Sequence, residues 1–350
     1  MSHTLLFALI SHHLGHTVDW GEPKAKDWAD TYNLARRHAL CGVLFPSFDA
    51  CPYRDTAPLG LYSTWSIFFQ KVQDAYYKRV TQCQELQKVF TDVAMPSCII
   101  KGIASAALYP KPELRQNGDI DIWVDASRKE LLHFLSSRFQ VGEVVYHHCD
   151  CEILQGCEIE VHFTPSWMND PILNKRLQRY FRGKVSAQCA HYDDTTACII
   201  ADRELCTVLG IVHIWRHLVS EGVTLRQIMD LYYALVGYED SKSLESLMDS
   251  LGLLKVTAAL MYVLDRVFAL PRQYHITQMD PVKGQLLLDE ILNYGGKYKK
   301  KGGQEGYSWT QFIKRSRQSM KFFSICPRDI LCSFPFKACQ FVWRVKNNYI

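Results

Sequence analysis

The sequence predicts an α+β fold in which a mixed α/β core lies between helical regions. Residues 1–92 and 201–294 have apolar side chains at spacings of three and four, which is typical of helices that bury one face. Residues 93–200 contain short β-rich runs with helices between them, as in a mixed module. The chain has 350 residues, 48% of them hydrophobic, which is enough to bury the core of two or three compact units.

The N-terminal region is predicted to be helical up to about residue 92. Its clearest helices are Trp28–His38 and Leu61–Val93, with a loop over Pro46–Pro58 between them. The apolar run Leu5–Ile10 has no preceding Lys or Arg and no clear cleavage site, which argues against a signal peptide. Charged residues and histidines interrupt every apolar stretch before the roughly 18 to 20 residues of a membrane-spanning helix. We therefore expect a cytoplasmic protein without a transmembrane segment.

The core is predicted to alternate strands with short helices. The predicted strands are Cys98–Ile100, Ile120–Val124, Glu143–Cys149, Cys151–Leu154 and Cys157–Phe163. A helix from Gly102 to Leu108 separates the first two strands. Ser127 and Glu130 form a capping box that starts a second helix, which runs to about Phe139. The last two strands are expected to form a hairpin.

Helical periodicity returns from Asp202, and we predict a helical bundle over residues 201–294. Residues 295–306 are rich in Gly and Lys and are predicted to be a flexible basic linker. Residues 307–350 form a predicted basic, aromatic helical tail, because positions 311–350 carry eight Lys or Arg and one Asp while the whole chain has a net charge of +4. We expect this tail to pack against the bundle, with nucleic acid or a membrane surface as alternative partners.

Histidines and cysteines raise the question of zinc. The thirteen cysteines are scattered through apolar segments, so most are expected to be buried free thiols. The run His147–Cys151 contains metal-binding residue types, but the chain has no CxxC pair to supply the usual spacing. His213 and His217 lie one helical turn apart without the Glu of a metalloprotease motif, so we favour a structural or nucleotide-facing role.

Carboxylates recur on one face of two predicted strands. Asp119 and Asp121 share one face of their strand, while Ile and Val occupy the other, and Glu160 has the same position on a later strand. The Asp-x-Asp pair alone is equally typical of a solvated strand face. Three carboxylates from adjacent strands, however, repel unless cations bind between them, and they can hold two metal ions. Oxygen ligands favour Mg²⁺, with Mn²⁺ as a second candidate.

The residues around these carboxylates are candidates for nucleotide binding. Lys101 and Gly102 end one strand and start a helix, whose amides and dipole can face phosphate oxygens. Arg115, four residues before Asp119, is a second candidate for a phosphate contact. Both cations are also compatible with ordinary surface positions. His162 lies two residues after Glu160 on the same face and is a candidate for touching substrate.

Together these residues resemble a known family. Lys101-Gly102, Leu108-Tyr109-Pro110, Arg115, Gly118-Asp119-Ile120-Asp121 and Glu160-Val161-His162 look like the uncharacterised nucleotidyltransferase-like family of the DNA polymerase beta-type nucleotidyltransferase superfamily. The resemblance covers roughly residues 95–240. The glycine-serine pair that is usual in the superfamily is imperfect here, because Ile103 follows Gly102, and the spacing to Asp119 is somewhat long.

The resemblance implies a polymerase beta-like core, a mixed sheet with helices behind it, and a two-magnesium nucleotidyltransferase. Such an enzyme moves a nucleoside monophosphate, here AMP from ATP, to a hydroxyl acceptor. Asp119 and Asp121 would bind both ions, and Glu160 would complete the site and accept a proton. The nucleotide would be contacted by Lys101, Gly102, Arg115 and His162.

Two alternatives come from other classes of protein. The chain could be a catalytically degenerate nucleotidyltransferase-like module that acts through a protein partner. It could also be a glycosyltransferase that holds Mn²⁺ with Asp-x-Asp, although such enzymes need a nucleotide-binding α/β region before the motif, where this sequence predicts helices. The acceptor, the preferred nucleoside triphosphate and the oligomeric state are open at the level of sequence.

Overall fold

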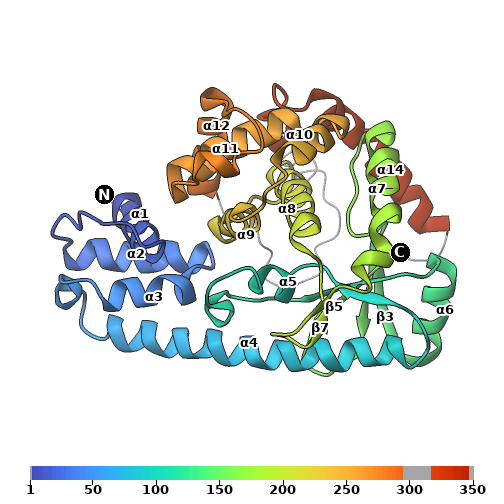
Figure 1. Ribbon diagram of the computed structural model, residues 1–350, viewed down its shortest axis with the longest axis horizontal. Coiled ribbons are helices and arrows are strands. Elements are labelled where there is room, and N and C mark those ends of the chain that lie inside the picture. The colour runs from blue at the N-terminus through green and yellow to red at the C-terminus, as the bar shows by residue number, and fades with distance from the viewer. Residues whose placement is uncertain (1, 295–316, 347–350) are drawn as a thin grey trace.

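The structure is a computed structural model that describes residues 2–294 and 317–346. The long helix α4 runs along one side of the molecule, with helices α1 to α3 against one end and a β-sheet against the other (Figure 1). Helices α8 to α12 lie on the opposite side of the sheet region from α4 (Figure 1). The predicted linker over 295–306 lies outside the described residues, as does the tail before residue 317.

The elements have the following bounds. The helices are α1 (Ser2–His13), α2 (Ala25–Arg37), α3 (Cys41–Asp49), α4 (Leu61–Thr91), α5 (Ile103–Ala106), α6 (Arg128–Arg138), α7 (Pro171–Gln188), α8 (Arg203–Leu218), α9 (Leu225–Leu235), α10 (Ser241–Ser250), α11 (Leu254–Phe268), α12 (Pro281–Tyr294) and α14 (Pro327–Lys346). The strands are β1 (Ser97–Ile99), β2 (Ile120–Val124), β3 (Gln140–Val144), β4 (His148–Glu152), β5 (Ile159–His162), β6 (Tyr192–Asp193) and β7 (Cys198–Ile199).

The main sheet has five strands in the order β1-β2-β5-β4-β3. β2 and β5 are parallel, and the other neighbouring pairs are antiparallel. All five residues of β2 are buried, as expected for a central strand that is covered on both faces. The predicted α+β architecture, with a mixed sheet and helices around it, is confirmed.

The predicted strand boundaries are wrong between residues 140 and 154. The prediction ends one strand at Cys149 and starts the next at Cys151, whereas β4 runs through Asp150 without a break. Its side chains alternate between the buried Cys149 and Cys151 and the more exposed His148 and Asp150. This alternation is the period of a strand with one solvated face, so a charged residue at 150 does not interrupt pairing.

Two helical segments also differ from the prediction. The predicted loop over Pro46–Pro58 is wrong at its start, because α3 continues through Pro46 to Asp49. Pro46 removes one helical hydrogen bond, a cost that the burial of the apolar residues of α3 outweighs. Helix α7 was not predicted, although Asp170 caps it by accepting hydrogen bonds from the first amides and Pro171 occupies the first helical position.

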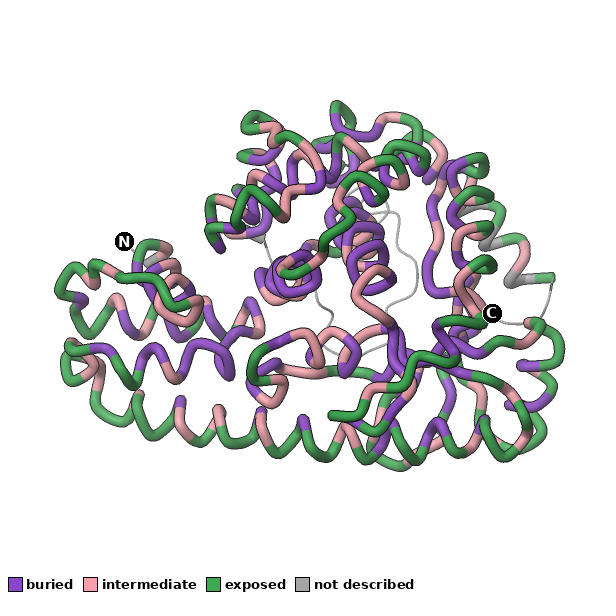
Figure 2. Tube along the Cα trace, in the orientation of Figure 1, coloured by how far each residue is buried: buried purple, intermediate pink, exposed green. Residues whose placement is uncertain are grey.

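Helix α4 connects the N-terminal helices to the sheet. Its 31 residues span about 46 Å. At its N-terminal end, Trp65 stacks on Phe48 of α3 with ring centroids 4.8 Å apart, and Trp28 of α2 packs edge-on against the same phenyl ring. At its C-terminal end, Phe90 packs against Phe134 of α6. Buried residues concentrate in the strands and in α8 and α9, whereas the outer face of α4 is exposed (Figure 2).

The described part of the C-terminal tail is attached to the rest of the fold by a buried carboxylate. Asp329 on α14 accepts hydrogen bonds from the Trp215 indole of α8 at 3.0 Å and from the backbone amide of Asn169 at 2.7 Å. Arg328 forms an ion pair with Asp170 at the start of α7. These contacts agree with the expected packing of the tail against the helices.

Most cysteines are buried and all are free thiols, as the sequence predicts. In the described ranges, no helix is both long enough and apolar enough to cross a bilayer.

Candidate active site

Acidic side chains lie in a row across the middle of the sheet. In the parallel pair of β2 and β5, Asp121 lies directly opposite Glu160. In the antiparallel pair of β4 and β5, Asp150 also lies opposite Glu160. Asp119 immediately precedes β2 and is exposed. The sheet therefore brings together the three carboxylates singled out from the sequence and adds Asp150, which the sequence indicated only as part of the possible zinc run His147–Cys151.

Asp121 is the buried centre of this group, with 3% of its surface exposed. Its Oδ1 atom accepts hydrogen bonds from Lys101 Nζ at 2.5 Å and from His162 Nε2 at 2.9 Å. Burial raises the pKa of Asp121, but the positive charge of Lys101 and the His162 hydrogen bond outweigh it and hold the pKa well below its usual range. Asp121 is therefore an anion at neutral pH.

His162 joins the two central strands. Its Nε2 atom lies 2.9 Å from Asp121 Oδ1 and 3.3 Å from Glu160 Oε2, and its side chain is fully buried. Its Nδ1 atom lies 3.4 Å from the backbone carbonyl of Thr164. Burial lowers the pKa of His162, but the hydrogen bonds to the two carboxylates outweigh burial and raise it. In this structure His162 contacts the acidic residues directly.

The acidic residues affect one another through their charges. The negative charge of Asp121 is the main cause of the raised pKa of Asp119, and Glu160 adds to it. Burial, and then Glu160, raise the pKa of Asp150 to about 6. Like charges held this close disfavour ionisation, which is a cost that a bound dication removes.

These oxygen donors fit the divalent cation that the family resemblance implies. One ligand atom each from Asp121, Glu160 and His162 lies within 4.8 Å of the others, and Asp119 borders this group. Carboxylate oxygens suit Mg²⁺, and the additional imidazole nitrogen suits Mn²⁺ as well.

Lys101 and Gly102 follow β1 at the edge of this group. Gly102 has φ +54° and ψ −103°, a backbone conformation that residues with a Cβ rarely adopt. The helix predicted from Gly102 to Leu108 is only the four-residue α5. A helix of one turn has a smaller dipole than the longer helix predicted here. Lys101 remains a cation beside the carboxylates, where it is paired with Asp121.

Arg115 is buried and forms an ion pair with Asp230. It is 3% exposed, and its Nε and Nη2 atoms donate to the two carboxylate oxygens of Asp230 on α9 at 2.7 and 2.8 Å. Tyr109 donates to the same carboxylate at 2.7 Å. The Nη1 atom of Arg115 donates to the Asn117 side chain. Arg115 thus fixes the segment that leads into Asp119 and β2 against the helical bundle.

Further cations face the site from the helical bundle, and sequence reasoning gave no sign of their position. Arg226 at the start of α9 donates to the backbone carbonyl of Gln116 at 3.2 Å, and its charge lowers the pKa of Asp119 against the larger effect of the carboxylates. Arg216 on α8 lies over the Trp167 ring at 3.0 Å, and burial lowers its pKa to about 9. The site is therefore acidic on the sheet and basic on the helices that face it.

The structure divides the candidate zinc residues. His147, His148 and Asp150 lie in groups able to hold a metal, whereas the cysteines of the same run do not. Cys149 and Cys151 lie on the buried side of β4, away from His148 and Asp150. The rings of His213 and His217 are in contact, with centroids 4.1 Å apart and planes tilted by 51°. Within the described residues, the groups able to hold a metal contain neither a cysteine nor this pair.

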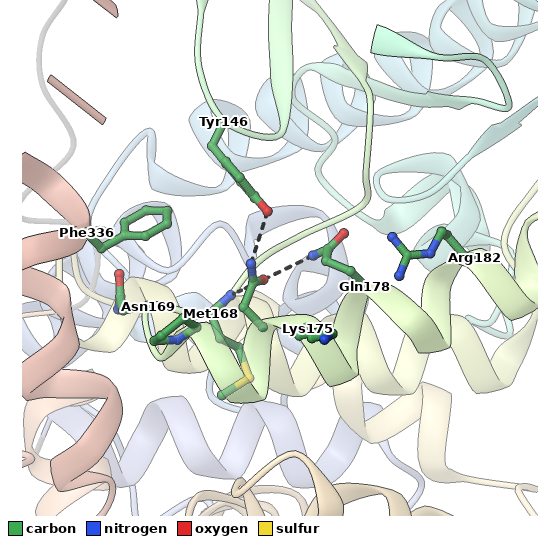
Figure 3. Close-up of a pocket in the computed structure, with 9 residues that line it drawn as sticks. Tyr146, Met168, Asn169, Lys175, Gln178, Arg182 and Phe336 are labelled. Atoms are coloured by element: carbon green, nitrogen blue, oxygen red, sulfur yellow. Dashed lines mark hydrogen bonds between the residues drawn. The ribbon is translucent and has the colours of Figure 1, made fainter. Parts of the chain in front are cut away.

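A pocket of about 290 Å³ lies beside α7 (Figure 3). Asn174 donates to the Tyr146 hydroxyl at 3.0 Å, and Gln178 donates to Asn174 at 3.1 Å. Gln178 also accepts a hydrogen bond from Thr164, whose carbonyl faces His162. The pocket is lined by Tyr146, Met168, Asn169, Pro171, Asn174, Lys175, Gln178, Arg182 and Phe336. It is separate from the carboxylates but connected to them through these contacts.

Comparison with known families identifies the class of protein that this fold and site define. Residues 24–269 match the family described as uncharacterised nucleotidyltransferase. The chain belongs to this family, as the motifs predict. The match begins before α2 and ends after α11, so it extends beyond the predicted range of 95–240 at both ends. No curated protein matches the chain in a sequence comparison.

Proposed function

We propose that this protein transfers a nucleoside monophosphate, AMP from ATP, to a hydroxyl acceptor. One observation carries the proposal: in a chain of the nucleotidyltransferase family, the register of β2 and β5 sets Asp121 directly opposite Glu160, with Asp119 adjacent. In the reaction, the acceptor oxygen bonds to the α-phosphorus, the bond from that phosphorus to the bridging oxygen breaks, and pyrophosphate leaves. The acceptor hydroxyl gives up its proton, for which Glu160 is the proposed acceptor.

In this proposal Asp119 and Asp121 hold two Mg²⁺ ions and Glu160 completes the site. When bound, the ions supply charge neutralisation for the triphosphate and lower the pKa of the acceptor hydroxyl. Lys101 neutralises Asp121 and lies where a phosphate oxygen would approach, beside the Gly102 backbone. His162 orients Asp121 and Glu160, and we propose that it also faces the nucleotide.

We assign Arg115 a positioning role instead of a direct phosphate contact, because its donors are engaged by Asp230 and Asn117. Arg226 takes its place as the proposed partner of the triphosphate. It approaches Asp119 from α9, and its Nε atom is buried without a hydrogen-bond partner among the described residues.

Calorimetry with ATP and Mg²⁺ tests the proposal. Asp119→Asn is the informative variant, because Asp119 is exposed and its change should not disturb folding. Glu152→Gln is the matched control, since Glu152 is an exposed carboxylate at the end of β4. We expect the wild type and the control to bind ATP alike, and Asp119→Asn to bind at least about tenfold more weakly, a loss of about 1.4 kcal/mol. Equal binding by all three proteins would overturn the proposal.

Transfer itself is measured with α-labelled ATP and Mg²⁺, alone and with cell extract to supply the acceptor. We expect label in an acceptor with the wild type and none with Asp119→Asn.

A binding module that acts through a protein partner is the second candidate. The contact between Lys101 and Asp121 favours it, because the ammonium group already neutralises the buried carboxylate. Absence of any nucleotide binding by the wild type, at saturating Mg²⁺, would support this candidate. The third alternative, an Asp-x-Asp glycosyltransferase, has no such support, because the family that matches the chain is one of nucleotidyltransferases.

A further inference from the structure

Three histidines converge beside the carboxylates. His148 lies opposite His162 in the pairing of β4 and β5, and His147 precedes β4. The ring centroids of His147, His148 and His162 lie 4.2 to 5.3 Å apart. One nitrogen from each lies within 4.8 Å of the others. We call these three residues the imidazole cluster.

The donor atoms of the cluster and its acidic neighbours are spaced like the ligands of one metal ion. His147 Nε2 lies 3.0 Å from His148 Nδ1, which lies 3.2 Å from Glu160 Oε2. His162 Nε2 lies 3.3 Å from the same Glu160 oxygen. Ligands about 2.1 Å from a metal are separated by about 3.0 Å at right angles and about 3.4 Å at tetrahedral angles.

The orientation of two of the three rings is also that of metal ligands, whereas Nδ1 of His147 is buried without a hydrogen-bond partner among the described residues. The Nδ1 atom of His162 faces the carbonyl of Thr164, which leaves Nε2 directed at the carboxylates. The Nε2 atom of His148 lies 3.6 Å from Asp150 Oδ1, which leaves Nδ1 directed at Glu160. Histidines that bind metals are commonly held by a carbonyl or a carboxylate on the other ring nitrogen.

The charge around the cluster favours a dication. Asp119, Asp121, Asp150 and Glu160 contribute four carboxylates. Against them stand Lys101, whose ammonium contacts Asp121, and Arg216, whose charge adds to burial in lowering the pKa of His147. The cluster combines imidazole nitrogens with carboxylate oxygens. This mixture favours Mn²⁺, Co²⁺ and Zn²⁺ over Mg²⁺, which prefers oxygen alone.

We propose that His147, His148, His162 and Glu160 form a binding site for a first-row transition-metal dication, of which Zn²⁺ is the best match. The site adjoins Asp121 and overlaps the site assigned to Mg²⁺, because Glu160 belongs to both and His162 Nε2 also contacts Asp121. The proposal does not depend on nucleotidyl transfer, because metal retention is a property of the protein without nucleotide.

Metal uptake tests the proposal directly. The full chain, freed of any affinity tag, is stripped with a chelator and dialysed against Zn²⁺ or Co²⁺ in the presence of excess Mg²⁺. We expect elemental analysis to find one transition-metal ion retained per chain. The Co²⁺ form should show visible absorption of a nitrogen-ligated, low-coordinate ion. Failure of the wild type to retain Zn²⁺ or Co²⁺ against Mg²⁺ would overturn the proposal.

His148→Ala identifies the ligands. His148 is partly exposed and lies on the solvated side of β4, so the variant is expected to fold, which circular dichroism checks. We expect Zn²⁺ affinity to fall at least about tenfold and the Co²⁺ bands to shift. The control His133→Asn removes an exposed histidine on α6 and should bind as the wild type does. An unchanged affinity and spectrum in His148→Ala would overturn the assignment.

If His148→Ala does not fold, the more conservative Glu160→Gln is measured in the same way, with the same expected loss. Neither readout uses ATP, so the result is separate from the fate of the transferase proposal. Metal retention without transfer would contradict only the proposed function, and transfer without metal retention would contradict only this inference.

Discussion

His38 is a buried histidine that the fold holds in its neutral form. It is fully buried at the end of α2, and its Nδ1 atom accepts a hydrogen bond from the backbone amide of Leu225 at the start of α9. Burial, followed by the charges of Arg37 and His3, lowers its pKa to about 3. His38 therefore links two helical regions only while its ring carries no charge.

This state makes stability depend on pH. The folded pKa of about 3 lies below the unfolded value of 6.5, so the stabilisation is present above pH 6.5 and is lost as the pH falls towards the folded pKa. For His38→Asn, which keeps an acceptor near the Nδ1 position and does not titrate, the stability deficit relative to the wild type should shrink by about 2 kcal/mol between pH 7 and pH 5.

Urea unfolding at both pH values measures this effect. His133→Asn serves as the control, because it makes the same substitution at a histidine whose side chain is exposed. A deficit for His38→Asn that is the same at pH 7 and pH 5 would contradict the prediction.

At the residue scale, the candidate site divides into residues that local sequence can indicate and residues that it cannot. The alternation along two strands predicts that Asp121 and Glu160 share a face, and the sheet register brings them together. The role of Arg115 was not predictable, because its partner Asp230 is distant in the chain and nothing local indicates the pairing. His148 was considered only within the possible zinc run His147–Cys151, and its place beside Glu160 was missed for a local reason. Ending a strand at Cys149 hid the alternation that sets His148 and Asp150 beside Glu160.

At the scale of elements, the pair of Arg115 and Asp230 connects the strand that carries the site to α9. The contact has two hydrogen bonds, and Arg115 is almost completely buried. Asp230→Asn would leave a buried guanidinium without its counter-charge, so we expect the free energy of unfolding to fall by about 3 to 5 kcal/mol. Chemical denaturation measures this loss.

A matched control is the pair of Asp280 and Lys283 at the start of α12. It is as short, at 2.6 Å, but both side chains are about a quarter exposed. Asp280→Asn keeps a side chain able to cap α12, and we expect it to cost less than about 1 kcal/mol. Similar losses of unfolding free energy in Asp230→Asn and Asp280→Asn would show that the buried pair of Arg115 and Asp230 contributes no more to stability than a partly exposed pair.

At the scale of the whole molecule, α4 makes the N-terminal helices and the sheet one structural unit. Trp65 is fully buried at one end of α4, where its indole donates to the Cys41 carbonyl at 2.9 Å. Trp65→Ala should lower the free energy of unfolding by about 3 to 5 kcal/mol. Because α4 also packs against β1 and β2 of the sheet, we expect amide hydrogens of β2 to lose the same amount of protection from exchange as those of α3.

Hydrogen exchange followed by mass spectrometry measures both regions in one experiment. Ile67→Ala is the control, since Ile67 lies on α4 with 58% of its surface exposed and should cost less than about 0.5 kcal/mol. Loss of protection confined to α1, α2 and α3 would show that the two parts unfold independently.

The overall architecture was predictable because it depends on patterns that repeat over many residues. Long helical periodicity at both ends and strand alternation in the middle give the α+β order that the structure has. The extent of the family match was not predictable from the motifs, since the match includes α2, α3 and α4, which lack motif residues. Their place in the family agrees with the packing of α4, which contacts both α3 and the strands β1 and β2.

Because β2 pairs directly with β5, the distance between the carboxylates Asp121 and Glu160 does not depend on how many residues lie between the two strands. Asp121 and Glu160 are neighbours through strand register alone, while α6, β3 and β4 form an excursion that returns to the sheet. In the turn between β4 and β5, Gly156 is exposed and has open space around it. The turn can therefore take additional residues without moving Asp121 or Glu160. The same turn is the natural point at which to insert a fluorescent reporter.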